Sequence, residues 1–200
     1  CIKESLDVLV IDSDGYVSRK EMYNKAVYIS GKIIKALNHS NMWSMDASKY
    51  REGENGSLTD EQFELLENFL KHNVYALQGF AGVGKTTTTE RLVAMLKDNN
   101  KTIAMMAPTG RASKVMSSYC GFPASTIHRG LGFNGTWQLD HFDNIFADVV
   151  IIDESSMGDL DLMYRLISSI DFNHTKLLMV GDFEQLPSVS AGNVFYDLVT

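Results

Sequence analysis

Eight consecutive residues have glycine, lysine and threonine at a spacing suited to binding a chain of phosphates. The segment Gly79-Phe-Ala-Gly-Val-Gly84-Lys85-Thr86 fits the pattern GxxxxGK[ST] at every fixed position. Glycines let backbone N–H groups surround phosphate oxygens without steric clashes. The lysine reaches the β- and γ-phosphates, and the threonine hydroxyl is a ligand for Mg²⁺. The pattern predicts a site for ATP and Mg²⁺ with nucleotide contacts from Gly79, Ala81, Gly82, Val83, Gly84, Lys85, Thr86 and Thr87.

Two acidic residues follow a short apolar run, Asp148-Val-Val-Ile-Ile-Asp153, and are the second group that could do chemistry. A carboxylate at the tip of a strand can hold Mg²⁺, usually through water. A second carboxylate beside it can orient or deprotonate an attacking water molecule. We therefore predict Asp153 as a metal residue, together with Thr86, and Glu154 as the catalytic base. The alternative is that the two acids only begin the next turn.

Strands and helices that would position these residues alternate along the chain. Apolar runs predict strands, and amphipathic runs with capping residues predict helices. The predicted strands are 74–78, 102–107, 148–153 and 176–180, and the predicted helices are 59–71, 85–97, 111–119 and 160–170. This order is typical of an α/β fold, with a parallel sheet and helices on both faces. The carboxyl ends of the strands then meet at one edge, where ligands bind.

Residues 1–56 precede a polar stretch at 51–57 that contains two glycines and predicts a linker. Before it we expect a strand at 8–11, a turn at 12–15, a second short strand and a helix at 20–37. This predicts a small α+β segment, separate from residues 57–200. The run Asp12–Glu21 also matches part of a calcium-binding EF-hand loop, but Val10 occupies the first ligand position and a strand precedes it. A glycine-containing hairpin turn explains the run more simply.

The composition is that of an ordinary globular protein, with 44% hydrophobic and 22% charged residues and a net charge of −7. No apolar run approaches the roughly 20 residues needed to cross a membrane. No leader for secretion is recognisable, and two cysteines without metal-ligand spacing favour a reducing, cytoplasmic setting. Basic and acidic residues are unevenly distributed along the chain. Residues 85–129 include seven basic and two acidic residues, whereas residues 130–200 include two basic and eleven acidic residues. A basic face for nucleic acid is compatible with this pattern, and so is chance clustering.

Five further motifs accompany the phosphate-binding loop. They are Leu58-Thr-Asp-Glu-Gln62, Ala107-Pro-Thr-Gly-Arg-Ala-Ser113, Ser125-Thr-Ile-His128, Asp153-Glu-Ser-Ser-Met157 and Val180-Gly-Asp-Phe-Glu-Gln-Leu-Pro-Ser-Val189. Their order over residues 58–197 resembles superfamily 1 DNA helicases of the RecD type, the alpha subunit of exodeoxyribonuclease V and its stand-alone relatives. The resemblance implies a P-loop NTPase lobe of RecA-like fold. It also implies ATP-driven, five-prime to three-prime movement on single-stranded DNA in recombination or repair. Whether other subunits of a recombination nuclease complex are partners stays open.

Roles for single residues also follow from the resemblance. Gln62 would contact adenine, although Thr59 and Gln62 also form a capping-box pattern that starts a helix. Gln185 would sense the γ-phosphate with support from Asp182, so the predicted catalytic set is Lys85, Glu154 and Gln185. Contacts with the DNA backbone would come from Thr109, Arg111, Thr126 and His128. For Arg111 and His128 the alternative is ordinary surface and core packing.

Three expectations concern the limits of this resemblance. The chain begins at Cys1 and stops soon after Gln185, so we expect a piece of a longer protein without the second lobe and its charge-stabilising arginines. We therefore expect ATP binding with weak hydrolysis. Asn134-Gly135 predicts a hairpin, either a strand-splitting pin or a plain surface turn. A P-loop kinase or small-molecule ATPase is the rival class, but Gly181-Asp-x-x-Gln185 favours a motor.

Overall fold

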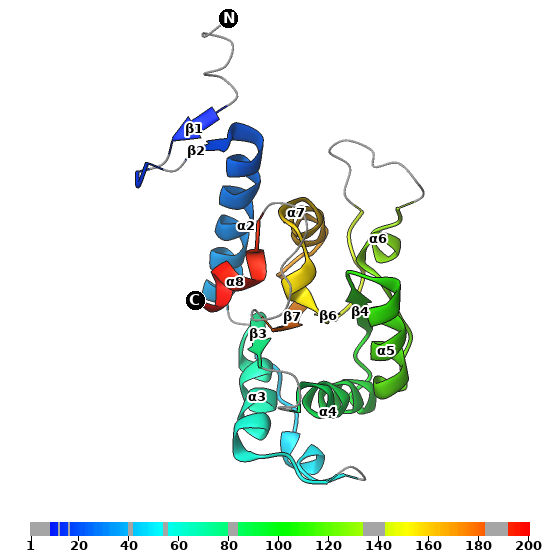
Figure 1. Cartoon of the computed structure of the whole chain (residues 1–200). Coiled ribbons are helices and arrows are strands. Elements are labelled where there is room, and N and C mark those ends of the chain that lie inside the picture. The colour runs from blue at the N-terminus through cyan, green and yellow to red at the C-terminus, as the bar shows by residue number, and fades with distance from the viewer. Residues whose placement is uncertain are drawn as a thin grey trace, which may run out of the picture.

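A five-stranded parallel sheet forms the centre of the protein (Figure 1). The computed structural model describes residues 9–11, 13–15, 17–39, 42–53, 56–79, 84–133, 143–182 and 192–200. Across the sheet the strands run in the order β3 (Val74–Gln78), β7 (Lys176–Gly181), β6 (Val149–Ile152), β4 (Ile103–Ala107) and β5 (Ala124–Thr126). All pairings are parallel, which confirms the predicted α/β fold with a parallel sheet.

Helices cover both faces of the sheet (Figure 1). One face carries α2 (Lys20–Asn38), α6 (Ile127–Gly130), α7 (Leu160–Ser168) and α8 (Val194–Val199). The other face carries α3 (Asp60–Lys71), α4 (Lys85–Asp98) and α5 (Gly110–Cys120). Two short 3₁₀ helices, η1 (Ala47–Tyr50) and η2 (Ser155–Met157), complete the described elements.

The sequence of β6 explains why helices are needed on both sides. Successive side chains of a strand point to opposite faces of the sheet. Val149 and Ile151 enter the core beneath α3, α4 and α5, whereas Val150 and Ile152 enter the core beneath α2 and α7. All four side chains have no exposed surface. A continuous apolar strand of this kind is stable only where both of its faces are covered.

Side-chain caps determine where several helices begin at the carboxyl edge of the sheet. Thr59 caps α3, and the Thr59 N–H donates in return to Gln62 Oε1, completing a capping box. The hydroxyls of Thr109 and Thr126 accept hydrogen bonds in the first turns of α5 and α6. Asp159 caps α7. Each such cap stabilises its helix by about 1 kcal/mol.

The N-terminal part contributes a hairpin and a helix. Strands β1 (Leu9–Ile11) and β2 (Val17–Arg19) pair antiparallel, which confirms the predicted hairpin. The following helix α2 packs along α7. Through Ile29 and Ile33 it belongs to the same core as β6 and β7. A division of the chain near residue 57 stays a prediction. No helix in the described ranges is long and apolar enough to cross a membrane.

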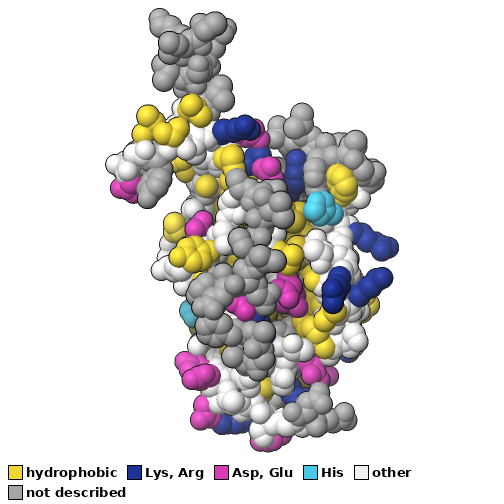
Figure 2. Space-filling view, viewed as in Figure 1, with side chains coloured by type: hydrophobic (Ala, Val, Ile, Leu, Met, Phe, Trp, Pro, Cys, Tyr) yellow, Lys and Arg dark blue, Asp and Glu magenta, His cyan; other side chains and the backbone are white. Residues whose placement is uncertain are grey.

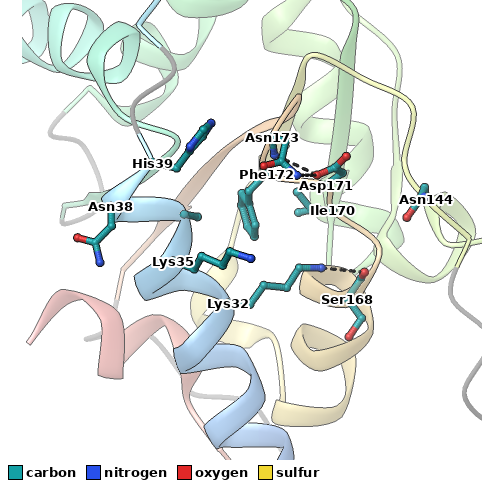
Figure 3. A pocket seen from close by; sticks show the side chains of 11 residues that line it. Lys32, Lys35, Asn38, His39, Asn144, Ser168, Ile170, Asp171, Phe172 and Asn173 are labelled. Atoms are coloured by element: carbon teal, nitrogen blue, oxygen red, sulfur yellow. Dashed lines mark hydrogen bonds between the residues drawn. The ribbon is translucent and has the colours of Figure 1, made fainter.

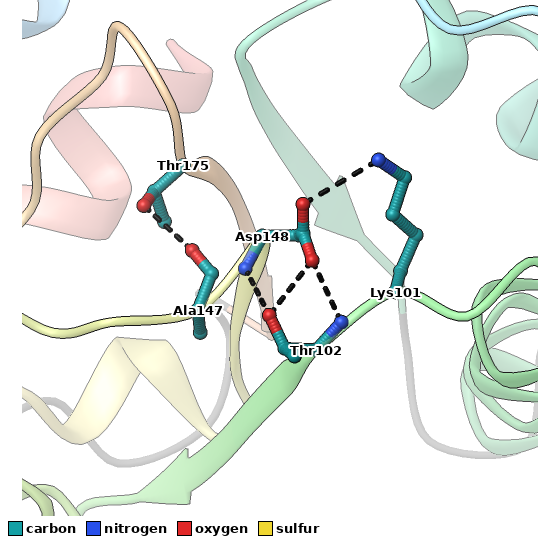
Figure 4. A network of polar contacts seen from close by, with 5 residues as sticks. All are labelled: Lys101, Thr102, Ala147, Asp148 and Thr175. Carbon is teal, nitrogen blue, oxygen red and sulfur yellow. Dashed lines mark hydrogen bonds and ion pairs between the residues drawn. The ribbon is translucent and has the colours of Figure 1, made fainter.

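Polar contacts join the strands at their amino ends (Figure 4). The Thr102 N–H and hydroxyl donate to Asp148 Oδ2 over 2.8 and 2.7 Å, and Lys101 Nζ lies 3.4 Å from Asp148 Oδ1. Beside them, the Thr175 hydroxyl donates to the Ala147 carbonyl over 2.7 Å. These bonds link the starts of β4, β6 and β7. Side-chain hydrogen bonds therefore stabilise this edge of the sheet in addition to the backbone hydrogen bonds between the strands.

Sequence-based bounds and observed bounds differ in a few places. The predicted strand 74–78 is observed without change, and the helix predicted to end at residue 170 ends at Ser168. Apart from the two 3₁₀ helices, three described elements were not predicted: β5, α6 and α8. Their lengths of three, four and six residues are too short for a periodic pattern. The predicted hairpin at Asn134–Gly135 lies outside the described residues.

Candidate nucleotide site and the adjoining cleft

The end of the glycine-rich segment leads directly into α4. Gly84 has φ +83°, in the left-handed region that favours glycine, and Lys85 is the first residue of the helix. The N-terminus of a helix carries partial positive charge and free N–H groups, both of which suit an anion. Among the predicted nucleotide residues, Ala81, Gly82 and Val83 lie outside the described residues.

Lys85 joins the ends of two strands. Its ammonium donates to the carbonyl oxygen of Gly79, just after β3, and to that of Gly181, at the end of β7, over 3.5 Å. It also lies 3.8 Å from Asp182 Oδ2. Asp182 is only 5% exposed, so little water screens this ion pair. The lysine charge is therefore held at the carboxyl edge of the sheet, at the start of α4.

Gln62 lies against the same segment. A Cβ atom built on Gly84 would come 2.1 Å from Gln62 Nε2, so any larger residue at position 84 would displace this side chain. Position 84 thus favours glycine for its backbone conformation, and a larger residue would also have to move the end of the Gln62 side chain. The capping role of Gln62 in α3 is observed. Its adenine contact remains a prediction, for which its place beside the phosphate-binding segment is suitable.

Asp153 and Glu154 follow β6, which lies two strands away from β3, the strand that precedes Lys85 in the chain. Asp153 accepts hydrogen bonds on both oxygens: from the Tyr119 hydroxyl at Oδ2 over 2.8 Å and from the Glu154 N–H at Oδ1 over 2.9 Å. Glu154 has φ +52°, an uncommon conformation for a residue other than glycine. Such conformations cost free energy and cluster at functional sites.

The environment of Glu154 makes its carboxyl group easier to protonate. Burial raises its pKa above the ordinary value of 4.5, and the charges of Asp153 and Asp182 raise the pKa further, while Lys85 acts in the opposite direction. A carboxylate with a raised pKa is a stronger base. This agrees chemically with the predicted role of Glu154 in accepting a proton from water.

A cleft of about 270 Å³ adjoins these carboxylates. It is lined by Thr109, Arg111, Ala112, Val115, Asp153, Glu154 and Met157. Two of the predicted DNA residues, Thr109 and Arg111, therefore lie beside the two predicted catalytic and metal carboxylates. Figure 2 shows Lys and Arg side chains grouped over α5 and α6 on the right of the viewed face. The exposed basic residues of these two helices are Arg111, Lys114 and Arg129.

The other two predicted DNA residues lie on the neighbouring strand and helix. Thr126 ends β5, which pairs with β4 through Ala107. His128 is half-buried, and its ring contacts the ring of Phe133 edge-on, with centroids 5.6 Å apart. Neither residue lines the described cleft. Gln185, the predicted γ-phosphate sensor, lies outside the described residues.

A larger cavity, of about 540 Å³, contains none of the predicted site residues. It lies between the end of α2 and the turn after α7 (Figure 3). Lys32 donates there to the carbonyl oxygens of Ile167 and Ser168 over 2.7 and 3.0 Å. A lysine on the last carbonyls of a helix stabilises the negative end of its dipole. The main polar contact of this cavity is thus explained by helix capping.

Tyr119 is a residue of the site that the sequence motifs do not predict. The tyrosine is in the last turn of α5 and lies 34 positions before Asp153 in the chain. An aromatic residue near a helix end has the same pattern as a core residue, and its ring does pack against the core. Only the fold brings its hydroxyl to the carboxylate.

Similarity to known proteins agrees with this geometry. Residues 57–200 match the family model of an AAA domain. The ATP-dependent RecD2 DNA helicase of Deinococcus radiodurans is 34% identical over 136 residues, which are 68% of this chain and 19% of that protein. The RecD subunit of the RecBCD enzyme of Mycolicibacterium smegmatis is 32% identical over 171 residues, with 72% and 31% covered. The chain thus spans less than a third of either relative's length.

A solved structure of Pif1 helicases at forked dsDNA is also similar, with a TM-score of 0.49 and 27% identity over 71% of this chain and 37% of that one. The family assignment depends on the match over residues 57–200, which is most of the chain, and on the RecD relatives. The chain belongs to the superfamily 1 DNA helicases of the RecD type and corresponds to their ATP-binding lobe.

Proposed function

We propose that this chain binds Mg-ATP at the carboxyl edge of its sheet and, within a DNA helicase, couples ATP hydrolysis to movement along single-stranded DNA. The observation that carries the proposal is the position of the Lys85 ammonium. It lies at the start of α4, between the ends of β3 and β7 and next to Asp182. A cation held there is available to the β- and γ-phosphates of a nucleotide.

The nucleotide would be held mainly by backbone groups. The proposed contacts are N–H groups from Gly79 to Thr87 and, at the adenine end, Gln62. Gly84 supports this arrangement, because its backbone conformation and its lack of a side chain leave room for Gln62 beside the loop. Lys85 would stabilise negative charge that develops on the transferred phosphoryl group.

Mg²⁺ fits the oxygen donors of this site. Asp153 has one hydrogen-bond donor on each oxygen. A carboxylate has about four lone-pair sites, so lone pairs remain for a metal-bound water. Mg²⁺ commonly binds proteins through one or two carboxylates together with substrate phosphates. Bound next to Thr86 and Asp153, it would neutralise phosphate charge. Glu154, whose pKa burial raises, would accept the proton of the attacking water.

Single-stranded DNA would lie along the basic surface of α5 and α6. Arg111 supports this position because it is exposed and lines the cleft next to Glu154. Phosphate contacts of this kind bind DNA without regard to sequence. Thr109 and Thr126 already cap helices, so their proposed DNA contacts would come in addition to that role. Movement from five-prime to three-prime is proposed from the family resemblance alone.

These 200 residues alone should hydrolyse ATP weakly. The resemblance assigns charge-stabilising arginines to a second lobe, and an arginine finger contributes roughly 10³–10⁵ in rate. Three further proposals follow from the resemblance to RecD proteins: a role in recombination or repair, a cytoplasmic location and association with nuclease subunits. A P-loop kinase or small-molecule ATPase remains the rival, and only a motor would hydrolyse ATP faster when single-stranded DNA is added.

Calorimetric binding of a non-hydrolysable ATP analogue with Mg²⁺ tests the proposal. Lys85→Ala should weaken binding about 100-fold, because a charge-assisted bond to phosphate contributes up to about 3 kcal/mol. Lys97→Ala is a matched control, since it removes one positive charge from the last turn of the same helix. Equal affinities for the wild type and Lys85→Ala would refute the proposed site, as would a folded wild type that binds nothing at millimolar analogue.

A further inference from the structure

Tyr119 gives the metal-binding carboxylate a fixed orientation. Its hydroxyl donates to Asp153 Oδ2 over 2.8 Å, while the Glu154 N–H donates to Oδ1 over 2.9 Å. With a donor on each oxygen, the carboxylate cannot turn about its last bond without losing a hydrogen bond. The tyrosine comes from α5 and the N–H from the turn after β6, so two separate elements determine the orientation.

We propose that Tyr119 is a positioning residue that holds Asp153 in the orientation required by nucleotide-bound Mg²⁺. The inference rests on the proposed function, in which Asp153 serves the metal. Groups that hydrogen-bond to a metal-binding side chain orient it, and their loss typically weakens metal binding by about 10- to 100-fold. Tyr119 occupies such a place with respect to Asp153.

The Tyr119 hydroxyl is the donor in its bond with Asp153. An ionised carboxylate only accepts hydrogen bonds, so the polarity of this bond is fixed. The ring of Tyr119 packs against the core beneath α4 and α5, and phenylalanine would preserve that packing.

A second tyrosine offers a matched control. The hydroxyl of Tyr50, in η1, donates to Asp98 Oδ2 over 2.9 Å at the far end of α4. Its ring also packs against the same core. Tyr119→Phe and Tyr50→Phe therefore remove the same chemical group and the same kind of bond, one beside the predicted metal residue and one away from it.

The experiment titrates Mg²⁺ into each protein with a fluorescent, non-hydrolysable ATP analogue and also measures analogue affinity without Mg²⁺. Tyr119→Phe should raise the half-saturating Mg²⁺ concentration about tenfold. Its Mg²⁺-free affinity should equal that of the wild type, and Tyr50→Phe should match the wild type in both measurements. Thermal unfolding of both variants checks that the loss of one tyrosine–aspartate bond changes stability similarly.

Each outcome has a distinct meaning. An unchanged Mg²⁺ requirement in Tyr119→Phe would overturn the positioning role while leaving the nucleotide site intact. An equal rise in both variants would also overturn it, because the effect would then be a general loss of stability. A wild type that binds the analogue neither with nor without Mg²⁺ would refute the proposed function itself, and the role of Tyr119 with it.

Discussion

The two ends of strand β6 hold carboxyl groups in opposite electrostatic settings. Asp148 precedes the strand and Glu154 follows it. Burial acts to raise the pKa of Asp148, but hydrogen bonds from Thr102 and the charge of Lys101 outweigh burial and hold the pKa below 3.8. Burial also raises the pKa of Glu154, and there the nearest charges include Asp153, which raises it further. The difference lies in the partners of each group.

The lysines of the two edges also differ in their surroundings. At the amino edge, Lys176 has no exposed surface and donates to the Leu70 and His72 carbonyls over 3.3 and 2.8 Å. Its ammonium also lies 5.0 Å from the Trp43 ring centre. At the carboxyl edge, Lys85 is partly exposed and has a carboxylate partner. Asp148 at the amino edge is held by donors and a positive charge, whereas Glu154 at the carboxyl edge lies near the like charges of Asp153 and Asp182.

This comparison predicts that Asp148 contributes to stability and not to nucleotide binding. Asp148→Ala removes three hydrogen bonds or ion pairs from Thr102 and Lys101. It should lower the free energy of unfolding by about 1–3 kcal/mol at pH 7. Because the folded pKa is depressed, the stabilisation exists above pH 3.8 and disappears as the pH falls through the folded pKa. Urea unfolding at pH 7 and pH 3 measures both effects.

Asp161→Ala is the control for this prediction. Asp161 is 69% exposed and pairs with Lys25 on the surface, a kind of pair that contributes about 0–1 kcal/mol. If Asp148→Ala lowered the free energy of unfolding no more than Asp161→Ala does, the amino edge would not be the stabilising end of the sheet. Loss of analogue binding in Asp148→Ala, with the fold intact, would equally contradict the comparison.

Lys176 should make stability depend on alkaline pH. Burial lowers the pKa of Lys176 from 10.5 to about 8, so keeping the ammonium charged costs free energy in the folded state. That cost is complete below pH 8, declines as the pH rises, and is absent above pH 10.5. The wild type should therefore gain stability relative to Lys176→Met between pH 8 and 10.5. Chemical denaturation across this range measures the difference, with Lys71→Met, at an exposed site, as the control. A flat difference would show that the buried amine is not destabilised.

Much of the fold follows from short-range patterns in the sequence. The run from Val149 to Ile152 is apolar and β-branched, and the structure buries it on both faces. The capping threonine at position 59 and the glycine at position 84 locate helix starts to within one residue. The short strand β5 escaped prediction because its Ser125 and Thr126 carry no apolar pattern. These residues form a strand because the edge of β4 is available for pairing. The cause therefore lies in the tertiary structure and not in the local sequence.

The candidate site also contains residues that local patterns predict and contacts that only the fold creates. Lys85, Glu154 and Asp153 could be named because each stands at a fixed spacing within a local motif. The Tyr119–Asp153 bond and the contact of Gln62 with Gly84 join residues far apart in the chain, and no local pattern reports them. The pKa direction of Glu154 likewise depends on burial and on the charges of Asp153, Lys85 and Asp182, two of which are distant in the chain. The spacing of residues within motifs identifies the chemical groups of the site, and the fold determines which residues contact them.

The prediction with the smallest expected effect concerns Glu154. It is also the most specific test of the electrostatic difference between the two ends of β6. Replacing its carboxylate with an amide of similar shape removes a half-buried negative charge near Asp153 and Asp182. Glu154→Gln should therefore raise the melting temperature at pH 7.5. Because the folded pKa lies above 4.5, the wild type regains stability as the pH falls through the folded pKa, and the advantage of the variant disappears near pH 4. Thermal unfolding at the two pH values gives the result.

Glu64→Gln, at an exposed position of α3, controls for the loss of a charge as such. If Glu154→Gln were less stable than the wild type at both pH values, the carboxylate would have partners that offset its burial, and the two edges of the sheet would differ less than their geometry indicates. If it were more stable only at pH 7.5, the base proposed for ATP hydrolysis would be held at a cost in stability. Removal of side chains at functional sites often stabilises a protein for that reason.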